Sequence, residues 1–183
     1  MNVLPFVLVG LFALLTSTAS AQQETPPSPR YLAAMQSEFS SLGIDASCSV
    51  SSASRAQCEY SYRGQRSQRD FPMHIVYSDE TDSVYIYVDR YLLAPPEAPG
   101  TDALLRRLMV YNWQMLAGKF EWDETDGEVR LSVVFHTDSN FDRRAFRSLI
   151  RAMALQADAY YGELSSLAST PPEATEASDT SPN

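Results

Sequence analysis

The fold is decided by the stretch from Phe71 to Arg90, which reads FPMHIVYSDETDSVYIYVDR. Apolar and other residues alternate on both sides of a polar turn at Asp79–Asp82, a pattern that predicts two antiparallel strands in one hairpin. A turn at that place sets Ile75 opposite Ile86. One face of the hairpin is then apolar or aromatic throughout and is expected to face the core: Phe71, Met73, Ile75, Tyr77, Val84, Ile86 and Val88.

The opposite face of this hairpin carries four side chains that are unusually apolar for a surface in water: His74, Val76, Tyr85 and Tyr87. Aromatic residues are enriched at the centres of protein interfaces, and a contiguous exposed apolar patch needs an explanation. These four residues are therefore a candidate interface. The alternative is that another helix or the segment Tyr91–Leu93 covers them.

A second hairpin is expected before this stretch, with strands at Ala46–Ser51 and Gln57–Arg63. A turn around Ala53 sets Cys48 opposite Cys58. Directly opposed residues of antiparallel strands lie close enough for a disulfide, and the chain has two cysteines in all. The sequence therefore predicts a Cys48–Cys58 disulfide.

A third hairpin is expected after it, with strands at Lys119–Asp123 and Glu128–His136. Between them lies Asp126-Gly127, one of the strongest turn dipeptides. This turn sets Phe120 opposite Leu131, so that both residues share the core face.

Three segments with apolar residues at helical spacing predict helices at Arg30–Leu42, Thr101–Ala117 and Asp142–Leu164. Ser139 or Asn140 is expected to cap the last helix. The middle helix has an expected buried stripe made of Leu105, Leu108, Met109, Asn112 and Leu116. Because a buried amide needs hydrogen-bond partners, Asn112 is predicted to be a buried structural residue that holds an adjoining loop or strand end.

These elements together predict an α+β fold in the order helix, two hairpins, helix, one hairpin, helix. One antiparallel sheet of about five to six strands, with the three helices packed on a single face, would bury all three helical stripes.

The two ends of the chain differ from the part between them. An apolar run at Val3–Leu15 leads to Ala19-Ser20-Ala21, which is typical of a signal peptide at residues 1–21. The alternative is an anchor that stays uncleaved, although the run is shorter than a membrane-spanning helix requires. Residues 22–29 and the acidic tail 168–183 are expected to be disordered because they contain too few apolar side chains. Residues 30–167 are expected to form a single domain.

Charge and motifs argue against several kinds of function. The formal net charge of −9 disfavours nucleic acid as a partner. The two histidines, His74 and His136, lack the spacing of metal or catalytic motifs. The acidic turn around Gly127 is no calcium loop, since an alignment on its glycine puts Trp122 and Val133 at ligand positions. We therefore expect no catalytic residue, no metal site and no cofactor.

Two groups of arginines have two interpretations, namely an anionic ligand or a solvated face with local salt bridges, and the second is favoured. The groups are Arg63, Arg66 and Arg69, and Arg143, Arg147 and Arg151.

Several of these features resemble a known family. They are Leu108, Asn112, Gly118-Lys119-Phe120, Asp126-Gly127, Val129, Leu131 and a long last helix that ends near Leu164. With them the chain resembles the YbjN-like bacterial sensory-transduction regulators, which share the fold of type III secretion chaperones, over roughly residues 30 to 165. The resemblance implies an α+β fold, frequent dimerisation, a role in protein binding or regulation, and no catalytic residues to carry over. The signal peptide and the cysteine pair depart from it and suit a periplasmic or extracellular relative.

The sequence thus predicts an exported protein, periplasmic or extracellular, that binds or regulates another protein in a chaperone-like way and is not an enzyme. A homodimer through the outer face of the sheet is expected, with no membrane span left after signal cleavage; the sequence does not identify the protein partner. One alternative is a small-ligand carrier or enzyme with a pocket between sheet and helices, lined by Tyr60, Tyr62, Trp113 and Trp122. Another is a structural component of the cell envelope in which the tails matter most.

Overall fold

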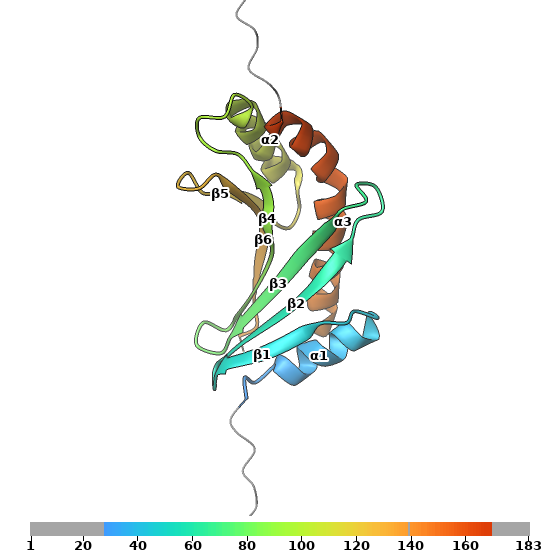
Figure 1. Cartoon of the computed structure of the whole chain (residues 1–183). Helices are drawn as coiled ribbons and strands as arrows, with labels where there is room; N and C mark the ends of the chain where they lie inside the picture. Colours follow the sequence, from blue (N-terminus) through green and yellow to red (C-terminus); the bar gives the residue numbers. More distant parts are fainter. Residues whose placement is uncertain (1–27, 139, 170–183) are drawn as a thin grey trace, which may run out of the picture.

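The computed structural model describes residues 28–138 and 140–169 and contains three helices and a six-stranded antiparallel sheet (Figure 1). The predicted α+β class and the predicted order of elements are confirmed. In chain order the elements are α1 (Leu32–Ser41), β1 (Ser47–Ser52), β2 (Arg55–Arg63), β3 (Asp70–Ser78), β4 (Ser83–Leu93), α2 (Thr101–Gln114), β5 (Lys119–Trp122), β6 (Glu128–His136) and α3 (Arg143–Ala168).

The strands lie in the order β1-β2-β3-β4-β6-β5, and every neighbouring pair is antiparallel. The three predicted hairpins form with the predicted registers, for example Ile75 opposite Ile86 and Phe120 opposite Leu131. The pairing that joins them into one sheet is β4 with β6, which brings the last hairpin beside the central one.

The helices lie on one face of the sheet (Figure 1). Helix α3 packs across β3, β4 and β6, α1 packs beside α3, and α2 packs against α3 and β5. All seven core-face residues predicted for the central hairpin are buried beneath these helices. Full burial of such a side chain contributes roughly 1.5 to 3 kcal/mol, so this face holds most of the apolar stabilisation of the sheet.

Strand β4 runs to Leu93, three residues beyond the predicted end, because it contains a β-bulge. The register with β6 shifts between Val88 and Leu92, and Arg90 adopts a positive φ of 45°. Over this shift β4 has two residues more than β6. Tyr91, in the irregular segment, turns into the core, where its hydroxyl donates to the carbonyl of Ala157 at 2.8 Å. A strict two-residue alternation cannot anticipate this switch of faces.

Helix α2 differs from its prediction in length and in facing. It ends at Gln114 rather than Ala117, because Met115 has extended backbone dihedrals. Its buried side is formed by Leu104, Leu108 and Tyr111, the last of which packs on Tyr160 of α3 with ring centroids 4.2 Å apart. The expected stripe was therefore wrong for two members, since Met109 and Leu116 are exposed.

Helix α3 is capped by Asp142, whose Oδ1 accepts from the backbone N–H of Ala145 at 2.9 Å. The expected cap at Asn140 was therefore wrong, and Ser139, the other expected cap, lies outside the described residues. It continues one turn past Leu164 to Ala168, so the expected tail begins inside the helix. The expected signal peptide (1–21), most of the expected linker (22–27) and residues 170–183 lie outside the described residues.

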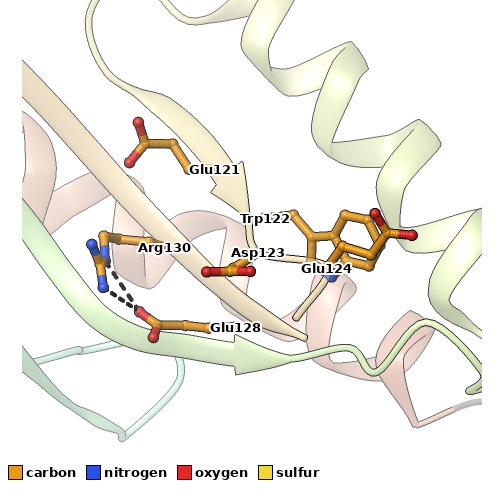
Figure 2. A pocket seen from close by; sticks show the side chains of 6 residues that line it. All are labelled: Glu121, Trp122, Asp123, Glu124, Glu128 and Arg130. Atoms are coloured by element: carbon orange, nitrogen blue, oxygen red, sulfur yellow. Dashed lines mark hydrogen bonds and ion pairs between the residues drawn. The ribbon is translucent and has the colours of Figure 1, made fainter. Parts of the chain in front are cut away.

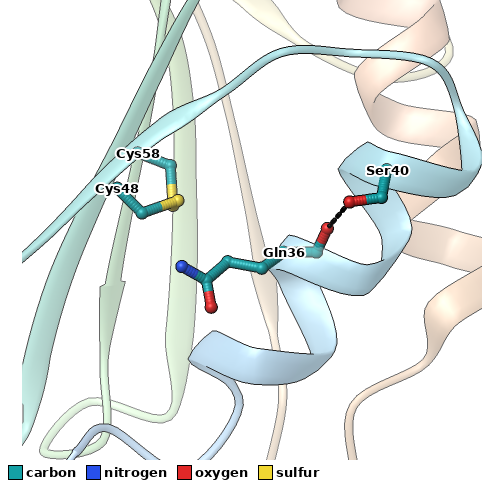
Figure 3. The surroundings of a disulfide bond; sticks show 4 residues. All are labelled: Gln36, Ser40, Cys48 and Cys58. Carbon is teal, nitrogen blue, oxygen red and sulfur yellow. Dashed lines mark hydrogen bonds between the residues drawn. A yellow bond between two sulfur atoms is a disulfide. The ribbon is translucent and has the colours of Figure 1, made fainter.

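The predicted disulfide is confirmed: Cys48 of β1 is bonded to Cys58 of β2 across an opposed pair. Figure 3 shows the bond on the side of the sheet that faces α1, where Gln36 and Ser40 lie. The closed loop is short, so in the chain-entropy model the bond contributes below about 3 kcal/mol. A disulfide is compatible with an oxidising, exported location.

A buried carboxylate joins α1 to α3. The side chain of Glu38 is almost wholly shielded from solvent, and its two oxygens accept from Arg143 at 2.7 Å and from Arg147 at 2.6 Å. Hydrogen bonds from Arg143, followed by those from Arg147, hold the pKa of Glu38 below its ordinary value. Arg143 and Arg147 therefore form local salt bridges, which supports the second interpretation of this arginine group over an anionic ligand.

We predict that Glu38→Gln lowers the midpoint of thermal unfolding at pH 7. Because the folded pKa is depressed, the ionised form stabilises the fold above the unfolded-state pKa, and this contribution is lost as the pH falls through the folded pKa. The difference between wild type and variant should therefore shrink between roughly pH 5 and pH 2. Circular dichroism melts over that range measure it, with Glu124→Gln, an exposed carboxylate, as the matched control. A difference that stays constant down to the lowest pH would contradict this account.

Candidate functional site

The outer face of the sheet, opposite the helices, carries the predicted aromatic group. The group comprises His74, Val76, Tyr85 and Tyr87, which are all partly exposed. The register of β3 with β4 sets His74 beside Tyr87 and Val76 beside Tyr85, so the four side chains form one contiguous patch. We call these four residues the outer patch. The alternative, a cover formed by Tyr91–Leu93, is not seen, because Tyr91 and Leu92 are buried in the core at the end of β4.

Ring stacking orders the outer patch. The ring of Tyr87 stacks on His74 with centroids 5.0 Å apart and on Tyr85 with centroids 4.9 Å apart, at interplanar angles of 17° and 24°. The guanidinium of Arg130, from β6, lies 4.8 Å from the Tyr87 ring centroid. Stacked rings and a cation over an aromatic face are both favourable arrangements. The patch is therefore a preformed surface.

Sequence reasoning missed two neighbours of the outer patch. Val134 of β6 lies beside Tyr85 and is exposed, which widens the apolar surface. Arg130 lies opposite Glu121 within the third hairpin, but its contact with Tyr87 depends on the β4–β6 pairing. That pairing joins strands about forty residues apart, and no turn signal marks it.

Hydrogen bonds and ion pairs fix the polar groups around the patch. The hydroxyl of Tyr85 donates to Glu121 at 2.9 Å, and the same carboxylate pairs with Lys119 at 2.8 Å. Arg130 pairs with Glu128 at 2.8 Å and with Asp89 at 3.5 Å. Burial raises the pKa of Tyr85 and of Tyr87 above the ordinary value, because it disfavours the charged form of each hydroxyl.

A shallow cavity of about 330 Å³ borders the patch at the β5–β6 turn (Figure 2). Its lining comprises Glu121, Trp122, Asp123, Glu124, Glu128 and Arg130. Figure 2 shows the Arg130 and Glu128 side chains turned toward each other, joined by the ion pair. The carboxylates of Asp123 and Asp126 accept from backbone N–H groups of their own turn, at 2.8 Å and 3.0 Å. They therefore shape the turn.

The part of the chain that the structure describes contains no group of three or more His, Cys, Asp or Glu side chains placed to hold a metal ion. Nor does any of its helices combine the length and the apolar character needed to cross a membrane.

Asn112 is half-buried and not fully buried as predicted, but its amide does bind the end of a neighbouring strand. Its Oδ1 accepts from the backbone N–H of Phe120 at 2.6 Å, and its Nδ2 donates to the carbonyl of the same residue at 3.1 Å. These two hydrogen bonds connect α2 to the start of β5. Without them, the backbone N–H and carbonyl of Phe120 would be unpaired at the edge of the sheet.

The four aromatic residues expected to line a pocket between sheet and helices do not meet. Trp113 is 90% exposed on α2, while the indole nitrogen of Trp122 donates to the carbonyl of Ala94 at 2.9 Å. Tyr60 and Tyr62 do share a cavity of about 350 Å³, together with the α1–β1 turn and α3. The hydroxyl of Tyr60 is buried and has no hydrogen-bond partner among the described residues.

Comparison with known proteins adds no functional assignment. No protein-family model matches the chain, and a search of curated proteins finds no match.

Proposed function

We propose that this chain is a non-enzymatic, exported protein-binding or regulatory module, chaperone-like in character, that forms a homodimer through the outer face of its sheet. The observation that carries the proposal is the outer patch, a stacked and partly exposed aromatic surface. The described helices cover the opposite face of the sheet, so none of them covers this side. Rigid aromatic side chains lose little conformational entropy on binding, which favours such a surface as the centre of an interface.

The resemblance to the YbjN-like regulators supports the same function, since it implies a protein-binding role and frequent dimerisation. The expected signal peptide and the Cys48–Cys58 disulfide favour a periplasmic or extracellular location. The proposed partner is therefore another exported protein, and the first partner of the outer patch is a second copy of this chain.

The order of residues across the outer face favours a second copy. One row of cross-strand neighbours runs Glu59, His74, Tyr87, Ser132 and Lys119, with an acidic group near one edge of the sheet and a basic group at the other. A two-fold axis parallel to the strands, above Tyr87, would stack the two Tyr87 rings. It would also place Glu59 of each copy over Lys119 of the other. Opposite charges then meet at both ends of the interface.

We expect wild-type protein to scatter light as a dimer and the Tyr85→Glu/Tyr87→Glu variant to scatter as a monomer, because two buried carboxylates would repel each other in the interface. Multi-angle light scattering during gel filtration over a range of concentrations measures both. Leu155→Glu, which adds a charge at an exposed apolar position on α3, is the matched control and should remain a dimer. If wild type and the variant are both monomers at every concentration, the homodimer part of the proposal is wrong.

A small-ligand carrier remains as a second candidate function, favoured by the cavity at Tyr60 and Tyr62. Its lining combines apolar side chains, such as Ile44 and Ile150, with the guanidinium of Arg151, which has no ion pair with a described residue. A ligand of this site would be an apolar molecule that carries an anionic group.

The anionic dye 8-anilinonaphthalene-1-sulfonate is a suitable probe for this candidate. A carrier should bind it at one saturable site, and Arg151→Glu should weaken binding by about tenfold through loss of charge pairing. Arg144→Glu, at an exposed position away from the cavity lining, should leave the affinity unchanged. Fluorescence titration measures these affinities, and an absence of saturable binding would dismiss the carrier.

A further inference from the structure

Helix α2 has apolar side chains on two sides, and only one of them is packed. Leu104, Leu108 and Tyr111 are buried against α3 and β5. The opposite side carries Met109, Val110 and Trp113, and Leu116 follows in the turn after the helix. An amphipathic surface helix normally carries charged or polar residues on this side. The second apolar side of α2 therefore needs an explanation that the fold does not supply.

We call Met109, Val110, Trp113 and Leu116 the α2 ridge. Their exposed fractions are 66%, 41%, 90% and 103%. Values this high for Trp113 and Leu116 mean that almost no neighbouring atom shields them, so the ridge projects from the molecule and does not line a groove. A projecting apolar ridge can insert into a soft apolar phase such as the acyl chains of a lipid bilayer. It does not suit a peptide, which needs a groove to lie in.

One cation beside the ridge can meet an anionic surface. Helix α2 has two arginines and one acidic residue, Asp102, while Lys119, which follows the helix, is already paired with Glu121 at 2.8 Å. Arg106 is exposed and lies one turn before Met109 and Val110, on the ridge side of the helix. It has no ion pair with a described residue, whereas Arg107 is paired with Glu163. Arginine and tryptophan together are the side chains best suited to the headgroup region of a bilayer.

We propose that the α2 ridge is a peripheral membrane-contact site that inserts into the surface of a bilayer containing anionic lipid. Trp113 and Leu116 enter the boundary between headgroups and acyl chains, and Arg106 contacts lipid phosphates. The outer patch belongs to other elements of the fold, so this site goes beyond the proposed protein-binding function and does not depend on it.

Trp113 provides a local reporter for the test. The chain has two tryptophans, so a Trp122→Phe background leaves Trp113 as the single fluorophore. The probe is a suspension of unilamellar vesicles made of three parts phosphatidylcholine and one part phosphatidylglycerol. Because the signal comes from Trp113 itself, it reports on the α2 ridge whether or not residues 1–21 have been removed.

Addition of vesicles should shift Trp113 emission to shorter wavelength. In the same background, Met109→Glu/Leu116→Glu should weaken vesicle binding by about tenfold or more, because charged side chains resist entry into the bilayer boundary. Leu155→Glu is the matched control with unchanged binding, and Tyr85→Glu/Tyr87→Glu should also bind as wild type does. The substituted side chains are solvent-exposed, so thermal unfolding should be unaltered in the ridge variant.

Three results would overturn the membrane-contact proposal. One is unchanged Trp113 emission in the presence of vesicles. Another is a shift that survives intact in Met109→Glu/Leu116→Glu. The third is a shift to shorter wavelength on concentrating the protein without lipid, which would mean that a second copy covers the ridge.

Discussion

The structure depends on the burial of one continuous apolar surface, the helix-facing side of the sheet, beneath α3. Side chains from β2, β3, β4 and β6 contribute to it, and α3 crosses three of those strands. A shift of one residue in any strand would turn its apolar side chains to the opposite face. Burial therefore fixes the registers, and the Cys48–Cys58 bond and the Glu38 ion pairs secure the edge strand and the first helix around that surface.

This arrangement gives the two faces of the sheet different surroundings. Because the three helices lie on one face, the other face is left to side chains that pack only on each other, as His74, Tyr87 and Tyr85 do. Arg130 and Glu121 hold the aromatic rings and hydroxyls in place from the neighbouring strands. Side chains that are already ordered in the free protein lose less conformational entropy on association. An ordered, partly apolar surface of this kind would therefore bind a partner at a lower entropic cost. Helix α2 is the exception among the helices, since it keeps an apolar side that no part of the described structure covers.

The sequence predicted much of the fold because hairpins are local. Alternation and turn residues set Ile75 opposite Ile86 and Cys48 opposite Cys58, and both pairings involve residues close in the chain. What it could not predict depends on contacts between distant segments. The bulge at Arg90 and the position of Val134 beside Tyr85 both follow from the pairing of β4 with β6.

The facing of α2 was wrong for a similar reason. Its sequence has apolar residues on two sides, so periodicity alone could not choose between them; the packing of Tyr111 on Tyr160 made the choice. The same ambiguity placed Trp113 in an expected pocket, although it is exposed on the opposite side of the helix. The sequence did identify the four residues of the outer patch, because all of them lie within one hairpin. It did not identify Arg130, which comes from another hairpin and stacks on Tyr87.

We propose that two copies of the chain meet through the outer faces of their sheets. Lys119 is the single lysine of the sequence, so zero-length carbodiimide coupling of the protein, followed by mass spectrometry, tests it directly. Isotope labelling of one copy separates links between copies from links within one. We expect a Lys119–Glu59 link between two copies, present in the dimer fraction. The opposite result would be a dimer in which Glu59 is unmodified and Lys119 is linked between copies only to carboxylates outside the outer face. That result would contradict a dimer formed through the outer faces.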